Sequence, residues 1–552
     1  MSLTIVAVVL MIMATVIIIS IISDVSARKR RMDELKESFG KPPESDRDCE
    51  FDSISKYTQY MKDKSLRVDD ITWNDLDMNK VFRRINVCLT SVGEEYLYNC
   101  LHELPLNPDK LQAREQLIRF FEKYPDKRLA VQSCLAGVGR DNFNGLPFLL
   151  FFGSHKMLKF HHVYNILALL PVLGALLFFV SISTGFFTVL GAFILNLIVY
   201  LRTKNQVDVE IPTIGYLTTV LKGVRRICKL KNLDDMPGMR ELTRIFAVFK
   251  PAMRSAPSTK TGVGDMMDSF FQYINILFLY DIRKYNTFVK MIVRHKEDLH
   301  TLYRSVGEID LALCVLSFRI SLPIAAVPEF HDGNSMEFSD IFHPLINSPV
   351  TNSGKVDKPS LITGSNASGK STFIKSLAVN GILAQTINTV AAREFKLRHS
   401  LIMTSMAIRD DIAGGDSYFI VEIKSLKRIL DKIRTFPCIC FIDEILRGTN
   451  TVERIAASTA VLEFIHTQDC ICLAASHDIE LTNILAGKYD NYHFREQVSD
   501  TGVAFDYLLR HGPSSTRNAL KLLSFTEFDN NIVTRAEHLA SEYDRNRAWL
   551  IE

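Results

Sequence analysis

The stretch Leu361–Thr372 reads Leu-Ile-Thr-Gly-Ser-Asn-Ala-Ser-Gly-Lys-Ser-Thr, and it decides the fold of the C-terminal part of the chain. It combines a short apolar strand, a loop bounded by Gly364 and Gly369, and the start of a helix. These glycines let successive backbone N–H groups face a polyphosphate, and Lys370 follows at the spacing that reaches the β- and γ-phosphates. In such a loop the hydroxyl of Ser371 is a ligand for Mg²⁺. The pattern predicts a nucleotide-phosphate site; the alternative is a glycine loop that precedes a helix by chance.

Two later strands end in polar residues that suit the same chemistry. The apolar run Cys438–Ile442 is followed at once by Asp443 and Glu444, which is typical of a buried parallel strand that ends in a metal-site carboxylate. Asp443 is expected to hold Mg²⁺, directly or through water, and Glu444 to orient or deprotonate the attacking water. An acidic pair at a strand end is otherwise an ordinary cap or turn. A second apolar run ends at Ala475, and His477 beyond it is placed to donate to the γ-phosphate, although a single histidine is more often a surface or core residue.

Length and charge set the broad limits. The chain has 552 residues, enough for two or three domains, and a formal net charge of +3. A charge this small gives no global basic field of the kind typical of nucleic-acid-binding proteins. The 10 cysteines follow no disulfide or zinc spacing, which predicts small buried residues and a reducing, cytoplasmic main body.

The first residues form a candidate membrane segment. Leu3–Ser23 is uncharged, apolar and long enough to cross a hydrocarbon core, and the basic run Arg28–Arg31 follows it. This order predicts an uncleaved anchor with the N-terminus outside and Arg28 inside. The alternative is a cleaved signal peptide, because Val25–Ala27 resembles a cleavage site. However, no positive side chain precedes the apolar run, and the run is long for a signal peptide.

A second membrane signal lies in the middle of the chain. Val163–Val180 and Phe186–Leu201 are mostly apolar and are joined by a short turn, which predicts a helical hairpin across the bilayer. Asn196 is a candidate for a polar contact between helices. The alternative is a buried helical pair within a soluble domain. With the anchor, the hairpin gives three spans in the cell membrane and a cytoplasmic main body, because the hairpin flanks are basic on both sides: Lys156, Lys159, Arg202 and Lys204.

The sequence from Ile71 up to the hairpin, and again over residues 205–330, is expected to form amphipathic helices. Two of its stretches are basic, Lys222–Lys231 and Arg283–Lys296. They suit contact with nucleic-acid phosphate or anionic lipid, and they equally suit a solvated helix face.

Taken in order, several motifs resemble the MutS family of mismatch-repair ATPases, which are ABC-type ATPases. The four main motifs are Gly364–Thr372, Asp410–Phe419, Asp443–Thr451 and Ala475–His477. Weaker similarities occur at Thr90–Gly93, Ser305–Asp310 and Phe342–Pro344. The resemblance covers roughly residues 70–552 and is strongest after residue 340.

The resemblance implies ATP and Mg²⁺ as cofactors and a role for each motif residue. Ser371 and Asp443 would hold the metal, and Glu444, His477 and Lys370 would be catalytic. Ser417 would reach the nucleotide of a partner subunit, which implies a homodimer with composite sites; its alternative role is a helix N-cap. Arg447–Thr449 would couple the two sites. The implied nucleotide-binding residues are Gly364, Ser365, Asn366, Ala367, Ser368, Gly369, Lys370, Ser371, Thr372 and Ser417.

The sequence also departs from the family pattern. An apolar anchor stands where the family has its mismatch-reading domain with a Phe-x-Glu wedge, so mismatch recognition is not expected. Leu446 stands where a small residue is usual. These departures predict a membrane-anchored variant that keeps the ATPase.

The sequence thus predicts a multidomain protein with membrane helices, an all-α lever and core domain, and a C-terminal α/β P-loop ATPase domain of ABC type. The expected domains are a transmembrane anchor (1–27), a cytoplasmic connector (28–70), a first helical part (71–162), a transmembrane hairpin (163–201), a second helical part (202–335) and the ATPase domain (336–552).

Two functional outputs stay open at this point. In one, closure on ATP moves helical levers that clamp DNA without specificity for mismatches. In the other, the levers act on a protein partner or on the lipid bilayer, with no role for DNA. A transporter is a third alternative, although three spans are few for a substrate path and Gly414–Ser417 differs from the transporter signature Leu-Ser-Gly-Gly-Gln.

Overall fold

The structure is a computed structural model and describes residues 11, 26–43, 49–61, 66–104, 109–141, 144–153, 157–158, 161–204, 207, 210–253, 265–364, 368–406, 418–499, 502–514 and 528–546. Among these residues the named strands all follow residue 328, and helices account for the named elements before it. The expected order, a helical part followed by an α/β part, is confirmed.

The chain forms two compact units. The helical unit comprises Met1–Asp63, Ile85–Asn99 and Gln112–Ser321, and the α/β unit comprises Lys64–Arg84, Cys100–Leu111 and Leu322–Glu552. The division differs from the expected domain ranges, because residues 64–84 and 100–111 belong with the C-terminal part.

The helical unit is built around α17 (Lys296–Ser321). Nearly all residues of this helix between Val306 and Phe318 are buried, which is typical of a helix with neighbours on every side. A further helix covers residues 26–38. The other named helices of the unit are α2 (Phe51–Ile54), α3 (Lys56–Tyr60), α6 (Ser91–His102), α7 (Asp109–Lys123), α8 (Pro125–Ala136), α9 (Leu146–Phe152), α10 (His161–Leu167), α11 (Leu170–Leu177), α12 (Ile182–Lys204), α13 (Glu210–Ile227), α14 (Met239–Met253), α15 (Asp265–Phe278) and α16 (Tyr280–Arg294).

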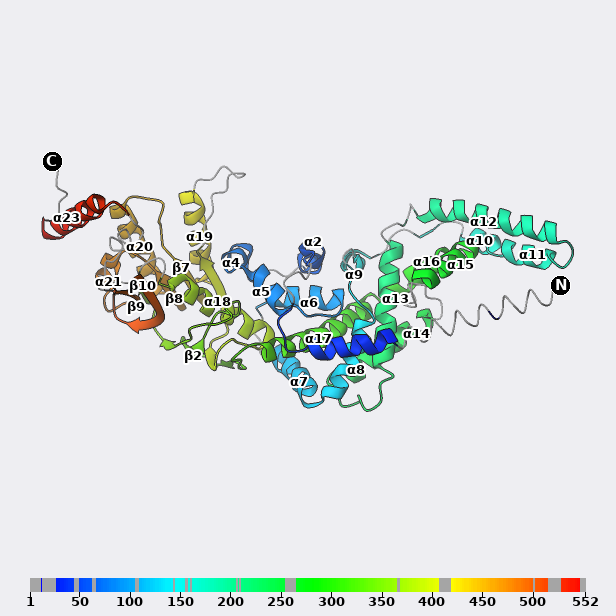
Figure 1. Cartoon of the computed structure of the whole chain (residues 1–552), viewed down its shortest axis with the longest axis horizontal. Coiled ribbons are helices and arrows are strands. Elements are labelled where there is room, and N and C mark those ends of the chain that lie inside the picture. Colours follow the sequence, from blue (N-terminus) through cyan, green and yellow to red (C-terminus); the bar gives the residue numbers. More distant parts are fainter. Residues whose placement is uncertain are drawn as a thin grey trace. The chain divides into compact units, whose positions relative to one another are not determined.

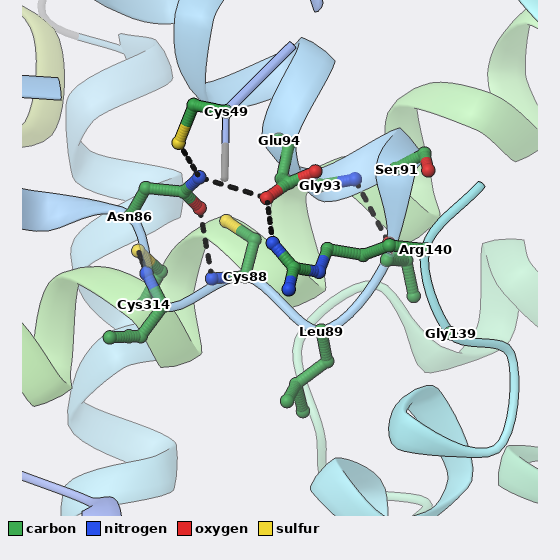
Figure 2. Close-up of polar contacts among 12 residues, drawn as sticks. Cys49, Asn86, Cys88, Leu89, Ser91, Gly93, Glu94, Gly139, Arg140 and Cys314 are labelled. Atoms are coloured by element: carbon green, nitrogen blue, oxygen red, sulfur yellow. Dashed lines mark hydrogen bonds and ion pairs between the residues drawn. The ribbon is translucent and has the colours of Figure 1, made fainter. Parts of the chain in front are cut away.

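Polar side chains lie inside this helical unit and are matched to one another. Figure 2 shows Glu94 between Asn86 and Arg140, and each of these two residues donates to Glu94 Oε1 at 2.9 Å. Asp310 on α17 accepts from the hydroxyl of Thr90 at 2.7 Å. Burial raises the pKa of the Asp310 carboxyl to about 6. The centre of the unit is therefore held by buried hydrogen bonds as well as by apolar packing.

α10, α11 and α12 form a helical hairpin over the residues where the sequence predicts a transmembrane hairpin. Figure 1 shows α11 and α12 side by side. The first leg is broken between Leu167 and Leu170. Within the described residues one helix, Ile182–Thr203, is long and apolar enough to cross a membrane by length and composition, and His162–Leu177 is a shorter apolar helix. The predicted anchor at Leu3–Ser23 lies outside the described residues apart from Met11.

The hairpin exposes most of its apolar side chains. Only 17% of the apolar window of α12 is buried. Asn196 lies among the few buried residues of this helix, with Ala192, Tyr200 and Thr203. It is fully buried, and its Nδ2 donates to the carbonyl of Leu277 at 2.7 Å and to that of Leu167 at 3.3 Å. The predicted polar contact between helices at Asn196 is confirmed. The largest exposed fractions on the hairpin belong to Phe179 (90%), Val180 (82%), Ile182 (77%) and Phe187 (68%).

The described residues of the α/β unit form two sheets. The larger sheet has the order β10-β9-β4-β8-β7-β6, and the smaller has the order β1-β5-β2-β3. The strands are β1 (Glu329–Phe330), β2 (Met336–Ile341), β3 (Asn352–Val356), β4 (Ser360–Thr363), β5 (Glu394–Leu397), β6 (Leu401–Ser405), β7 (Cys438–Asp443), β8 (Cys470–Ala475), β9 (Asp490–Ser499) and β10 (Gly502–His511). The named helices are α4 (Asp70–Asp75), α5 (Met78–Ile85), α18 (Lys370–Ile387), α19 (Tyr418–Lys432), α20 (Thr451–His466), α21 (Ile479–Ile484) and α23 (Asn530–Asn546).

The larger sheet is parallel from β9 to β6, and β10 alone is antiparallel to its neighbour. Its central strands β7 and β8 are apolar and buried, as expected for parallel strands covered by helices, and α18 and α20 pack on them. The predicted antiparallel hairpin around 499–502 is confirmed as β9 and β10. The cysteines of β7 and β8 are buried and form no disulfide, as predicted.

Candidate functional site

The phosphate-loop residues lie between β4 and α18. Gly364 has φ of +141°, and a Cβ there would lie 2.9 Å from the carbonyl oxygen of Phe494. Gly369 has φ of +100° and precedes the first helical residue, Lys370. Both positions therefore require glycine. Lys370 is buried, and its Nζ donates to the carbonyl of Gly364 at 2.6 Å, so the ammonium group lies back over the loop.

The predicted carboxylates lie at the end of β7. Asp443 is the last residue of the strand, and its buried Oδ1 has no hydrogen-bond partner among the described residues. Glu444 follows with φ of +57°, in the left-handed region that a residue with a side chain rarely adopts. Its backbone N–H donates to the carbonyl of Ala475 at 3.0 Å, which extends the ladder between β7 and β8. A backbone held in this region is typical of sites where the position of a side chain matters.

His477 faces Glu444. It follows β8, the strand next to β7, and its Nε2 lies 2.9 Å from Glu444 Oε1. Arg447 Nη1 lies 2.6 Å from Glu444 Oε2, so both oxygens of this carboxylate are held. His477 and Arg447 are partly exposed, and Glu444 is mostly covered.

Strand register brings the predicted residues to one edge of the sheet. Ile362 of β4 pairs with Ala475 of β8, and Ala475 pairs with Asp443 of β7. Neighbouring strands lie about 4.8 Å apart, so these three residues form a row roughly 10 Å long. The phosphate loop, Ser476–His477 and Glu444 each begin within two residues of this row. The carboxyl ends of parallel strands are where such folds place their ligand sites.

The structure does not place every predicted site residue at this edge of the sheet. Ser365, Asn366, Ala367 and Ser417 lie outside the described residues. Ser368 is buried next to the loop, and Ser371 and Thr372 are exposed in the first turn of α18.

Sequence reasoning missed one contact that shapes the site. Arg454 of α20 donates to both carboxylate oxygens of Asp478, at 2.9 and 2.6 Å. Asp478 directly follows His477, so this bidentate pair fixes the backbone next to the histidine. The signal was the acid immediately after the strand-end histidine, but its partner is 24 residues away and only the fold identifies it. A cavity of about 150 Å³ opens here, lined by Glu444, Ile445, Arg447, Arg454, Ser476, His477 and Asp478.

A magnesium ion suits the donors at this edge. Mg²⁺ in nucleotide sites is held by one or two protein oxygens together with phosphates and water. The unpartnered buried oxygen of Asp443 and the exposed hydroxyl of Ser371 are hard oxygen donors of this kind. No group of three His, Cys, Asp or Glu side chains that could hold a metal alone is found in the part of the chain that the structure describes.

Comparison with known proteins identifies the class of this domain. The family profile of MutS domain V matches residues 360–544, which begin at β4 and end within α23. Over these residues the chain matches the MutS family.

Individual relatives agree with this family. The chain is 32% identical over 193 residues to the DNA mismatch repair protein MutS of Thermus thermophilus, covering 35% of this chain and 24% of the relative. It is 33% identical over 186 residues to the DNA mismatch repair protein MutS 2 of Haloarcula marismortui, covering 33% and 20%. It is 30% identical over 276 residues to the human MutS protein homolog 4, covering 46% and 29%. The matched region spans less than a third of the length of these curated relatives.

Proposed function

We propose that this chain is a membrane-anchored, Mg²⁺-dependent ATPase of the MutS type. The observation that carries the proposal is the strand register, in which Ile362 of β4, Ala475 of β8 and Asp443 of β7 lie side by side. This register supports a single site built from the phosphate loop, the strand-end carboxylates and His477. The match of residues 360–544 to MutS domain V supports ATP as the nucleotide.

Each residue has a role in this proposal. Lys370 and the backbone N–H groups at the start of α18 would bind the phosphates, because a helix N-terminus and an ammonium group both favour negative charge. Ser371 and Asp443 would hold Mg²⁺, which supplies positive charge to the phosphates when bound. Glu444 would orient or deprotonate the attacking water, and His477 would donate to the γ-phosphate. The contact between Glu444 and His477 at 2.9 Å supports the assignment of these two residues to one reaction.

We further propose a homodimer, in which Ser417 of one subunit reaches the nucleotide of the other. This rests on the resemblance of Asp410–Phe419 to the family signature, since Ser417 lies outside the described residues. Closure on ATP would then move the helical units as levers.

The membrane part of the proposal rests on the hairpin. Many of its large apolar side chains are exposed, from Ile166 on α10 to Leu201 on α12. Gathered apolar side chains on a surface mark an interaction site for a membrane or a protein. Helix Ile182–Thr203 would cross or enter the bilayer, and Leu3–Ser23 and the leg His162–Leu177 would complete three spans, with the ATPase in the cytoplasm.

Two targets for the levers are proposed in order. The first is DNA, bound without specificity for mismatches, which the similarity to DNA mismatch repair proteins and the basic stretches support. The second is a protein partner or the bilayer itself, which the exposed hairpin supports.

ATP turnover of the full chain in nanodiscs tests the proposal, with and without duplex DNA. We expect Mg²⁺-dependent hydrolysis that Lys370→Ala abolishes and that Lys358→Ala leaves intact, because Lys358 is exposed at the opposite end of β4. Stimulation by DNA that declines with added salt supports the first target. Hydrolysis that is unchanged by DNA, with no gel shift, supports the second. Absence of nucleotide binding by the wild-type chain would refute the ATPase.

A further inference from the structure

The edge strand of the larger sheet is covered by a short helix from far upstream. Among the described strands β6 is at one end of the sheet and pairs only with β7, so its outer N–H and C=O groups need other partners. α4 supplies them. Thr404 N donates to Thr72 Oγ1 at 3.2 Å, and Met406 N donates to Asp75 Oδ2 at 3.0 Å. Asp75 Oδ2 also accepts from the hydroxyl of Thr404 at 2.7 Å.

These contacts are buried and specific. Thr72 and Thr404 are fully buried, and Asp75 is nearly so. Asp69 caps the same helix, because its side chain accepts from Thr72 N at 2.9 Å. The side chains of α4 thus replace the missing neighbour strand, and they do so at the point where β6 ends.

α19 is tied to the same place. Arg428 donates to the carbonyl of Thr404 and to the carboxylate of Asp69, so one guanidinium group joins β6, α4 and α19. Figure 1 shows α4 and α19 close together in the α/β unit. A guanidinium fork that holds a carbonyl and a carboxylate fixes the rotation of its helix as well as its distance.

The other end of α19 holds the loop that carries Glu444. Glu422 on α19 is buried, and its Oε1 accepts from Arg447 N at 3.2 Å. Glu444 and Leu446 in this loop both have left-handed backbone conformations, with φ of +57° and +55°. Such conformations persist only where the surroundings fix them, and Glu422 is one of the groups that do so.

We propose that α4 and α19 act together as a positioning element for Glu444, with Asp75 at one end and Glu422 at the other. The inference rests on the proposed ATPase function. The path runs from Asp75 through Thr404 of β6, and from Asp69 directly, to Arg428 on α19. It continues along α19 to Glu422 and the backbone of Arg447, whose side chain contacts Glu444 at 2.6 Å. Asp75 and Glu422 are positioning residues, because neither contacts the proposed reacting atoms. The element begins about 290 residues before domain V, so hydrolysis would depend on a segment outside the matched domain.

The test compares Asp75→Ala and Glu422→Ala with Asp70→Ala in the full chain. Asp70 lies exposed on the same helix and serves as the matched control. We expect kcat for ATP to fall on the order of 10- to 100-fold in both test variants, as for a small misplacement of a catalytic group, with KM changed less than about twofold. Glu422→Gln keeps an acceptor oxygen of the same reach and should restore most of the rate. The double variant should be little worse than either single variant, because both act through α19.

Amide hydrogen exchange gives a second readout that needs no hydrolysis. Exchange at residues 444–448 should be faster in Asp75→Ala than in Asp70→Ala, without global unfolding, because the loop loses its distant support. Equal exchange in these two variants would overturn the positioning role even if the wild-type chain proved to have no ATPase activity. If the wild-type chain has no ATPase activity but exchange is still faster in Asp75→Ala than in Asp70→Ala, the mechanical link stands and only the proposed function is refuted. A fall in kcat/KM caused by KM alone would also overturn the inference.

Discussion

Two apolar stretches of this molecule are treated in opposite ways. β7 runs from Cys438 to Asp443, and its apolar residues are all buried in the middle of a sheet. α12 is as poor in charge over Ile182–Thr203, but most of it is exposed. The strand has hydrogen-bonded neighbours on both edges and α18 against it, whereas the hairpin leg has α11 and α15 against only part of its surface. Apolar composition therefore predicts that a stretch is buried away from water. Only the fold shows whether other parts of the protein cover it. For α12 we propose lipid.

The largest expected effect tests the polar end of the buried stretch. Glu444→Gln removes the charge and basicity of the carboxylate while it keeps the shape that His477 and Arg447 contact. We expect kcat to fall by roughly 10²- to 10⁴-fold, the usual contribution of a general base, with ATP still bound. Turnover by malachite-green assay and ATP binding by filter retention measure the two parts.

The matched control is Glu463→Gln, which changes a surface acid on α20 that pairs with Lys488. It should leave both measurements unchanged. Retained hydrolysis in Glu444→Gln would remove Glu444 from the mechanism.

The second prediction tests the contrast in burial with one residue from each stretch. Phe441 of β7 is fully buried, whereas Phe179 at the hairpin turn is 90% exposed. Phe441→Ala should lower the free energy of unfolding of the α/β unit by about 3–5 kcal/mol, because it leaves a cavity in a packed core. Phe179→Ala should change the stability of the helical unit by less than about 0.5 kcal/mol. Pulse proteolysis in urea, followed by fragments from each unit, measures both.

A substitution at the same hairpin position, Phe179, tests whether lipid or another protein covers the exposed face of the hairpin. Phe179→Asp should weaken flotation with liposomes and leave the fold unchanged, because a charge at this position opposes burial in hydrocarbon. If flotation is unaffected while the stability of the helical unit falls, the exposed face is covered by protein and the contrast with β7 disappears.

Sequence predicted those parts of the α/β site whose residues lie at a fixed, short spacing from an apolar strand. The phosphate loop, the strand-end acids and His477 each follow an apolar run, so strand ends identified them. The contact of Glu422 with Arg447 N was beyond this reasoning, because the two residues lie on separate elements that only the fold brings together. The same holds for α4, whose fit against β6 depends on which strand becomes the edge of the sheet. In the helical unit, hydropathy predicted the hairpin and Asn196 but not the break between α10 and α11.

The third prediction uses pH to separate the two units. Asp310 in the helical unit has a pKa raised to about 6 by burial, so folding takes up a proton and the stability it contributes is lost as pH rises from about 4 to 6. His343 in the α/β unit has a pKa lowered to about 4, chiefly by burial and then by Lys375. Its contribution is present above about pH 6.5 and is lost as pH falls toward 4.

The two units should therefore respond to acid in opposite directions. Each of these groups changes the free energy of unfolding of its unit by up to about 3 kcal/mol over its range, from about 1.4 kcal/mol per pKa unit. Asp310→Asn and His343→Gln are the respective variants, and each should flatten the pH dependence of its own unit only. Parallel pH profiles in the two variants, measured by unit-specific proteolysis, would contradict the assignment.

The smallest expected effect concerns Asn196, the buried polar residue of the hairpin, and the stability lost when it is replaced. Asn196 Nδ2 donates to the carbonyls of Leu277 and Leu167, so it ties α12 to α15 and α10. In a bilayer such bonds average about 0.6 kcal/mol and reach about 1.7, because the unfolded helices find other partners in the membrane. In water, loss of a buried donor that leaves two carbonyls unsatisfied costs about 1–3 kcal/mol. Asn196→Leu should therefore cost less in nanodiscs than in mild detergent that wets the hairpin. Thr188→Ala, which removes an exposed bond within α12 itself, is the control and should cost the same in both. An equal cost for Asn196→Leu in the two media would indicate that these helices pack against protein in both, as β7 does.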